Sequence, residues 1–212
     1  MRRPTAGSRT SPRPRGGAAG AERRGVRITS GGLRGRLVRT PAGEGTRPLL
    51  TRLRKALADV LRPRLPGAKV LDLFGGSGAI AFELLSNGAA SAVICELDRA
   101  AAELVVRNAR DLGLEDRVRV LPGDALAWIE RLAGSGEVFD VLVVAPPYGL
   151  GLQDRALALL GAHPLAAPDA VIVVQRDAGE PGGEPPPGLE LCRSRRHGRT
   201  LFDLYRPRAV SG

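Results

Sequence analysis

Three acidic residues, Asp72, Glu96 and Asp124, each stand at or near the end of an apolar segment typical of a β-strand. Carboxylates at the carboxyl ends of parallel strands face the edge where open α/β sheets bind ligands. Glu96 follows Asp72 by 24 residues, a spacing that suits hydrogen bonds to ribose hydroxyls, and Asp124 could accept from the exocyclic amine of an adenine. The three acids predict a nucleoside site. The alternative is that Asp72 and Asp124 cap helices and that Glu96 is simply exposed.

A glycine-rich segment, Gly75–Gly78, separates Asp72 from the start of a predicted helix. Glycine lets the backbone approach a ligand closely, and the unpaired N–H groups of the helix start face the same way. Dinucleotide sites usually have Gly-x-Gly-x-x-Gly at this turn, whereas this chain has Asp72-x-Phe74-x-Gly76-x-Gly78. An acid in front of the glycines suits the cationic amino-acid end of a ligand better than a pyrophosphate.

The segment Phe139–Tyr148 joins an apolar run to two prolines and an aromatic ring. Pro146 and Pro147 end the predicted strand in a rigid turn, and Tyr148 could stack on a planar base. One class of enzyme has this arrangement beside a base that carries an amine, one hydrogen of which the backbone carbonyl of Pro146 could accept. Ala145, directly before the prolines, has no side-chain acceptor for the other hydrogen.

The elements that must position these residues alternate along the chain. Strands separated by helices of about 10–15 residues predict βαβ units and a parallel sheet. The last two strands have no helix between them, so we expect them to pair antiparallel at one edge. The expected strands of the sheet are 70–74, 91–96, 117–121, 139–144, 170–174, 189–193 and 200–205, and the helices between them are 78–87, 99–112, 125–132 and 153–160.

The composition indicates one folded domain with appendages. The chain has 212 residues, 43% of them hydrophobic, which suits a buried core. No apolar run approaches the roughly 20 residues of a membrane span, and the Arg-rich N-terminus lacks the apolar segment of a secretory signal. Cys95 and Cys192 fit neither a zinc site nor a disulfide framework, so we expect no metal. We expect a monomer in a reducing cytoplasm.

Positive charge is concentrated in the first third of the chain. Residues 1–65 hold 17 of the 32 lysines and arginines but three of the 22 acids. This asymmetry predicts a nucleic-acid partner that is bound largely through its phosphates. An arginine-rich genomic composition is the alternative, although it does not account for the scarcity of acids in this part of the chain.

Changes in composition divide the chain into three parts. Residues 1–25 combine arginine with Pro, Gly, Ser and Ala and have little to bury, so we expect a disordered tail. Residues 26–65 predict a basic extension that contacts RNA, made of a β-hairpin (26–28 with 36–38) and a helix. The polar face of that helix, expected to be solvated, carries Arg52, Arg54, Lys55 and Arg62. The domain with the nucleoside site then spans 66–212.

The order of the motifs is more distinctive than any one of them. Besides Asp72–Gly78, they are Arg27-Ile28, Gly35-Arg36, Thr46-Arg47-Pro48, Glu96, Gly123-Asp124 and Pro146-Pro147-Tyr148. The turn at Asp72–Gly78 resembles motif I of the S-adenosylmethionine methyltransferases. Together, from about Arg27 to Tyr205, the motifs resemble the bacterial 16S ribosomal RNA guanine-N2 methyltransferases.

This resemblance implies an α/β, Rossmann-like class I methyltransferase fold. Its seven-stranded, mostly parallel sheet would have an antiparallel C-terminal edge hairpin, with an N-terminal β-hairpin extension. The implied activity is methylation of the N2 amine of a guanine in the RNA of the small ribosomal subunit. S-adenosylmethionine would be held by Asp72, Phe74, Gly76, Gly78, Glu96 and Asp124. The target base would lie against Pro146 and Tyr148, and RNA would contact Arg27, Arg34, Arg36 and Arg47.

The chain departs from the family pattern on the side of the target amine. Ala145 stands where the family has Asp or Asn, Leu49-Leu50-Thr51 where polar residues are usual, and Lys55 where an acid is common. One hypothesis is an active RNA methyltransferase in which a water or another residue replaces the missing acceptor. A second is a catalytically impaired paralogue that binds S-adenosylmethionine and RNA without efficient transfer. A small-molecule methyltransferase would leave the basic first third without a use.

Overall fold

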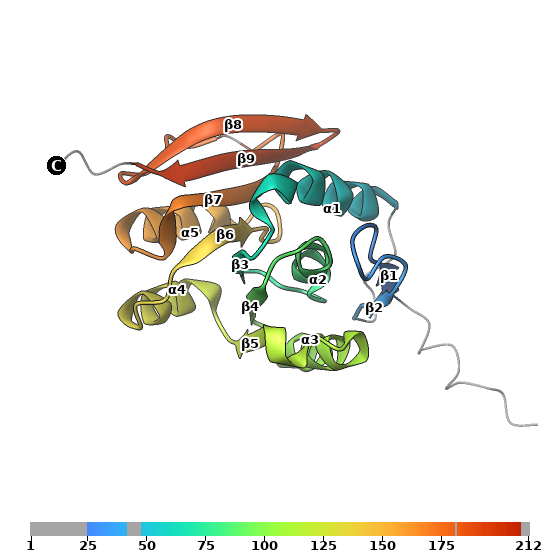
Figure 1. Ribbon diagram of the computed structural model, residues 1–212. Coiled ribbons are helices and arrows are strands. Elements are labelled where there is room, and N and C mark those ends of the chain that lie inside the picture. The colour runs from blue at the N-terminus through green and yellow to red at the C-terminus, as the bar shows by residue number, and fades with distance from the viewer. Residues whose placement is uncertain (1–24, 42–47, 181, 209–212) are drawn as a thin grey trace, which may run out of the picture.

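A computed structural model describes residues 25–41, 48–180 and 182–208 of the protein. Its elements are arranged around one central sheet (Figure 1). The strand order is β5-β4-β3-β6-β7-β9-β8. The first five of these run parallel, and β9 pairs antiparallel with both β7 and β8. The predicted seven-stranded, mostly parallel sheet with an antiparallel edge hairpin is therefore confirmed. Its strands are β3 (Lys69–Asp72), β4 (Ser91–Glu96), β5 (Val118–Pro122), β6 (Phe139–Val144), β7 (Ala166–Asp177), β8 (Leu189–His197) and β9 (Thr200–Pro207).

The central strands are apolar on both faces. Val70 and Leu71 are consecutive in β3, and Val141 and Leu142 are consecutive in β6, and all four are fully buried. Because successive side chains of a strand point to opposite faces, this pattern requires a cover on each side of the sheet.

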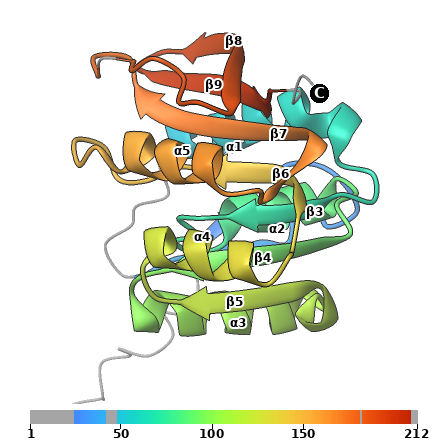
Figure 2. The same ribbon diagram turned by 90° about the vertical axis from the view of Figure 1, so that its left-hand side faces the viewer.

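Helices supply both covers (Figures 1 and 2). On one face lie α1 (Pro48–Leu61), α2 (Ala79–Ser86) and α3 (Arg99–Leu112), and on the other lie α4 (Ala125–Gly134) and α5 (Leu152–Ala162). Helix α3 shows how local sequence sets an element's limits. The side chain of Asp98 accepts a hydrogen bond from Ala101 N–H at 2.7 Å at its start, and Gly113 ends it with φ of 71°. Short 3₁₀ turns, η2 (Arg62–Arg64) and η3 (Glu115–Arg117), precede β3 and β5.

The N-terminal extension begins with the expected β-hairpin. Strands β1 (Gly25–Arg27) and β2 (Leu37–Arg39) pair antiparallel, with Val26 opposite Val38. Both valines are buried in the same hydrophobic cluster as α1, α2 and α3, so the hairpin is packed on the sheet domain.

A buried carboxylate fixes this hairpin to α2. Glu83 is fully buried and accepts hydrogen bonds from Thr29, through N–H at 2.9 Å and the hydroxyl at 2.6 Å, and from Ser30 N–H at 2.9 Å. Arg54 lies beside it, with Nε 3.9 Å from the Glu83 carboxylate and a guanidinium N–H bonded to the Arg27 carbonyl at 2.9 Å. Burial lowers the pKa of Arg54, and the negative charge of Glu83 opposes that shift.

The prediction that the polar face of the extension's helix is solvated is wrong at Arg54. Only 7% of this residue is exposed, because Glu83 and the Arg27 carbonyl compensate its charge inside the protein. Its neighbours Arg52, Lys55 and Arg62 are exposed, as expected.

The remaining differences from the sequence predictions concern element ends. Strand β7 runs to Asp177 and β8 to His197, beyond the apolar segments, because both pair with β9 as far as its first residue, Thr200. The predicted tail, apart from Gly25, lies outside the described residues, as do Thr46 and Arg47. No helix among the described residues has the length and apolar character to cross a membrane.

Candidate active site

The carboxyl ends of β4, β3 and β6 meet where the chain reverses its path across the sheet. The chain runs from β3 outward to β4 and β5 and then returns to β6 on the other side of β3. In open α/β sheets, ligands bind at such a switch point. Asp72 ends β3, Glu96 ends β4, and Ala145 directly follows β6. The structure thus brings the predicted cofactor residues and the predicted target residues to one edge of the sheet.

The glycine turn after β3 has a backbone that side chains would disrupt. Gly75 N–H donates to the Cys95 carbonyl at 2.8 Å, which fixes the turn to the end of β4. Gly78 has φ of 78°, and a Cβ there would lie 2.6 Å from the Phe82 ring. At Gly76 a Cβ would meet nothing within 4 Å, so the turn leaves room for a ligand on that side.

Glu96 is held in place by the turn beside it. One carboxylate oxygen accepts from Gly76 N–H at 2.6 Å and the other from Asp98 N–H at 2.8 Å. The side chain is half-buried, and each oxygen keeps a second lone pair. Glu96 can therefore accept from a hydroxyl group in the space next to the turn.

Asp72 is a fully buried carboxylate with an incomplete set of partners. Its Oδ1 lies 3.4 Å from Phe74 N–H, and its Oδ2 has no hydrogen-bond partner among the described residues. Burial raises the pKa of Asp72 to about 7, although the Phe74 N–H lowers it, and the charge of Glu96 raises it further. An unpaired buried carboxylate is unfavourable, so this position fits a ligand that brings a cationic or hydrogen-bond-donating group. Asp72 is not the N-cap residue of α2, which is Gly78, although the Ala81 N–H in the first turn of that helix also lowers the pKa of Asp72.

Asp124 caps a helix, which is the alternative to its predicted contact with an adenine. It is the N-cap of α4, and its carboxylate accepts from Leu126 N–H at 3.0 Å. Gly123 N–H donates to the Glu96 backbone carbonyl at 2.8 Å, which places Asp124 beside the end of β4. The carboxylate is exposed and keeps free acceptor capacity, so capping does not prevent contact with a ligand.

The target side consists of the segment after β6. Ala145 is half-buried against the hydrophobic cluster of α1, α2 and α3, and Pro146 is buried. Tyr148 is 43% exposed, yet its hydroxyl is fixed by the Gln175 amide N–H at 2.8 Å and by the Thr200 hydroxyl at 3.2 Å. The ring is therefore oriented from its polar end while much of its surface stays available.

Glu180 stabilises this segment from the loop after β7, and no sequence pattern indicated it. One carboxylate oxygen accepts from Gly149 N–H at 2.6 Å. The other accepts from Asp177 N–H at 3.0 Å and from the Gln153 amide at 3.3 Å. Glu180 begins a Pro/Gly-rich stretch with no periodicity, so only the folded structure reveals its partners.

Asn108 connects the extension to the glycine turn. This fully buried residue of α3 accepts from Arg39 N–H at 3.0 Å and donates to the Arg39 carbonyl at 2.9 Å and the Ser77 carbonyl at 3.1 Å. Its signal in the sequence is an amide among the apolar positions of a helix, which does not by itself identify the partner.

The predicted RNA-binding arginines of the extension are exposed where the structure describes them. Arg27 donates to the Gly35 carbonyl at 2.7 Å and Arg36 to the Asp111 carbonyl at 2.6 Å, and Arg34 has no side-chain partner among the described residues. Arg34 is thus the freest of the three for a phosphate, and Arg47 lies outside the described residues.

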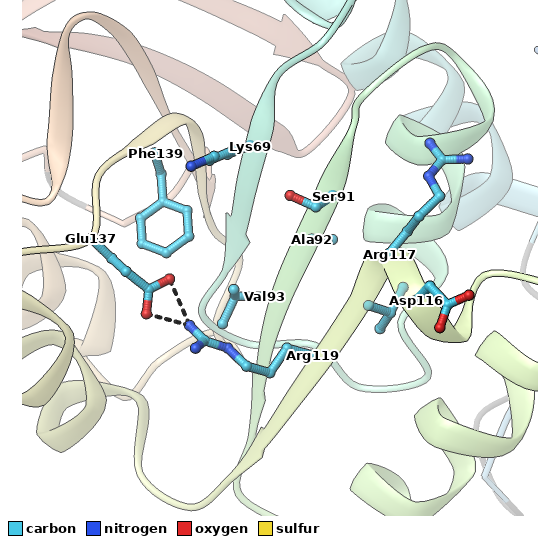
Figure 3. A pocket seen from close by; sticks show the side chains of 10 residues that line it. Lys69, Ser91, Ala92, Val93, Asp116, Arg117, Arg119, Glu137 and Phe139 are labelled. Carbon is cyan, nitrogen blue, oxygen red and sulfur yellow. Dashed lines mark hydrogen bonds and ion pairs between the residues drawn. The ribbon is translucent and has the colours of Figure 1, made fainter. Parts of the chain in front are cut away.

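A cavity of about 260 Å³ lies at the amino ends of the strands, opposite the candidate site (Figure 3). Lys69, Ser91 and Phe139, which begin β3, β4 and β6, contribute to its lining. Its Arg119 is bonded to Glu137 at 2.6 and 2.7 Å. Because this cavity faces the amino ends of the strands, it is separate from the edge formed by Asp72, Glu96 and Ala145.

A family model described as conserved hypothetical protein 95 matches residues 26–206. The chain is 32% identical, over 184 residues, to ribosomal RNA small subunit methyltransferase D of Escherichia coli K12, which covers 87% of this chain and 91% of that protein.

Solved structures agree with this match. The structure of the yhhF protein of Escherichia coli has a TM-score of 0.75 at 31% identity and covers 88% of this chain and 99% of that chain. A SAM-dependent methyltransferase from Agrobacterium tumefaciens has a TM-score of 0.59 over 81% of this chain and 67% of that one. At 18% identity the latter likeness shows the fold alone.

Proposed function

The chain belongs to the family described as conserved hypothetical protein 95, and we propose that it transfers a methyl group from S-adenosylmethionine to ribosomal RNA. The acceptor is the exocyclic N2 amine of a guanine in 16S RNA, and the small ribosomal subunit is the partner of a monomer. The observation that carries this proposal is the meeting of Asp72 and Glu96 with Ala145, Pro146 and Tyr148 at the switch point of the sheet.

The cofactor binds at the ends of β3, β4 and β5 in this proposal. Glu96 accepts from the ribose hydroxyls, Asp124 contacts the adenine, and the unpaired oxygen of Asp72 faces the amino-acid end. Gly76 and Gly78 bring the backbone close to the cofactor, with Phe74 packed against the core beneath. When bound, S-adenosylmethionine supplies a methyl group already activated on a sulfonium.

The task of the protein is then to position the target amine. The Pro146 carbonyl accepts one amine hydrogen, and Tyr148 stacks on the base with its ring fixed by Gln175 and Thr200. Extruding a stacked guanine costs a few kcal/mol, and stacking on an aromatic side chain recovers about 1–3 kcal/mol. Holding amine and methyl group in line provides the larger part of the catalysis, as effective molarity.

RNA affinity comes from the basic extension, residues 26–65, in which Arg27, Arg34, Arg36 and Arg47 contact phosphates. The connection through Asn108 keeps this surface at a fixed distance from the glycine turn. Binding should therefore weaken steeply with added salt, since each neutralised phosphate releases counterions.

One observation favours a second candidate function. Ala145 provides no acceptor for the second amine hydrogen, and an unmet hydrogen bond in a dry site costs about 1–3 kcal/mol. The alternative is therefore a protein that binds S-adenosylmethionine and RNA but transfers inefficiently.

Single-turnover transfer of a labelled methyl group to small-subunit RNA separates the two functions. Label in the RNA, located at a guanine N2 by nucleoside analysis, supports the enzyme. Calorimetric binding of S-adenosylmethionine without label transfer, even with enzyme in large excess, contradicts it and supports the alternative.

A further inference from the structure

Gln175 lies directly beside the position where the target side lacks an acceptor. Strands β6 and β7 run parallel, with Val143 opposite Val173 and Val144 opposite Val174. The next residues in this register are Ala145 and Gln175. Val143 and Val173 belong to the cluster on the α1–α3 face, against which Ala145 also packs. Because strand side chains alternate, Gln175 projects from the same face as Ala145, one strand away.

The amide of Gln175 is oriented by a contact that leaves its oxygen free. Its N–H donates to the Tyr148 hydroxyl at 2.8 Å, and that hydroxyl also meets Thr200. Among the described residues, no donor bonds to the amide oxygen of Gln175, and the side chain is only half-buried. A side chain held at its nitrogen presents its oxygen with little further loss of rotamer entropy.

The carboxylates of Glu180 and Asp177, by contrast, already accept bonds from groups of the protein. The two oxygens of Glu180 accept from Gly149, Asp177 and Gln153. The carboxylate of Asp177 accepts from Gly179 N–H at 2.8 Å and pairs with Arg199 at 3.4 Å. Among the described residues, Gln175 is therefore the side chain in register with Ala145 whose oxygen accepts no bond within the protein.

We propose that the amide oxygen of Gln175 replaces the acceptor missing at Ala145 and receives the second hydrogen of the target amine. This inference rests on the proposed function. Together with the Pro146 carbonyl it holds both amine hydrogens and directs the nitrogen lone pair at the methyl carbon. The nitrogen–carbon bond forms as the carbon–sulfur bond breaks, and the sulfonium becomes a neutral thioether. An amide is too weak a base to take the proton, so the nitrogen releases it to water.

The test compares Gln175→Ala, Ala145→Asn and the double variant in single-turnover methyl transfer to small-subunit RNA. Gln175→Ala should lower the rate about tenfold or more, as expected for a lost contact in a dry site, with the affinity for S-adenosylmethionine unchanged by calorimetry. Ala145→Asn restores an acceptor one strand away, so it should raise the rate at least tenfold more in the Gln175→Ala background than in the wild type. Thermal unfolding of each variant confirms that the fold is kept.

The Tyr148→Phe variant separates contact with the amine from support of the ring. It removes the hydroxyl that orients Gln175 but keeps the stacking surface. It should therefore lower the transfer rate less than Gln175→Ala does. The proposal is overturned if Tyr148→Phe and Gln175→Ala lower the transfer rate equally and if Ala145→Asn restores the rate of neither variant. A rate within twofold of wild type for Gln175→Ala overturns this proposal alone. Absence of transfer by the wild type overturns the proposed function with it.

Discussion

The two halves of the candidate site are assembled over different distances along the chain. The cofactor half is formed by Asp72, the glycine turn and Glu96. Here Asp72 accepts from Phe74, 2 positions away, and Gly76 donates to Glu96, 20 positions away. In the target half, formed by the segment Ala145–Tyr148 and its supports, Tyr148 bonds to residues 27 and 52 positions away, and Gly149 to one 31 away.

This difference has a physical consequence. One βαβ unit suffices to build the cofactor half, because the turn and the next strand end are its own parts. The target half needs β7, its loop and the antiparallel strand β9 in place before Tyr148 is fixed. Changes in the first half should therefore alter cofactor binding or stability, and changes in the second should alter transfer.

The largest expected effect is on stability, at Asp72 in the cofactor half. Its pKa in the folded protein, about 7, lies above its ordinary value of 3.8. The stability contributed by the neutral form is complete below about pH 4 and is lost as the pH rises through about 7. Asp72→Asn should therefore stabilise the cofactor-free protein by roughly 2–4 kcal/mol at pH 8 and much less at pH 5. Urea unfolding at both pH values measures this, and an equal effect at both would contradict it.

Glu96→Gln should weaken the cofactor half without disturbing the target half. Loss of a charged acceptor for the ribose should reduce affinity for S-adenosylmethionine about ten- to hundredfold. Transfer at saturating cofactor should stay close to wild type, because Tyr148 and Gln175 are unaffected. Calorimetry and single-turnover rates measure the two effects.

Glu115→Gln is the matched control for this variant, since it makes the same exchange at an exposed position of η3. A rate loss at saturating cofactor for Glu96→Gln would mean that the halves are not separable.

Glu180→Ala should have the reverse pattern. Without the bonds to Gly149 and Asp177, the segment after β6 loses its position, and transfer should fall about tenfold. The affinity for S-adenosylmethionine should not change. Glu184→Ala, an exposed acid in the same loop, is the control with the same change in charge. Weaker cofactor binding by Glu180→Ala would show that the loop serves both halves.

Arg34→Ala should have the smallest effect and act on neither half directly. Loss of one phosphate contact should weaken RNA binding a few-fold and reduce the slope of log affinity against log salt by about 1. Arg155→Ala removes the same charge from α5, on the opposite face of the sheet, and should leave that slope unchanged. Equal slopes for the two variants would contradict a role of the extension in binding RNA.

Sequence patterns were most informative where the chemistry is local. The alternation of strands and helices, the glycine turn and the acids at strand ends follow from short segments, and the structure places them as expected. The same reasoning failed at Arg54, where helical period indicated a solvated face. A charge is buried there because Glu83, from another helix, compensates it.

Residue types and near spacing were enough to predict the parallel sheet, the place proposed for the cofactor half and the gap at Ala145. Only the folded protein shows that Gln175 stands next to that gap, that Glu180 holds Gly149 and that Asn108 joins the extension to the turn. These contacts depend on strand register and on loops returning from distant segments. Neither leaves a periodic signal, since one hydrogen bond between remote residues requires only a polar atom at each end.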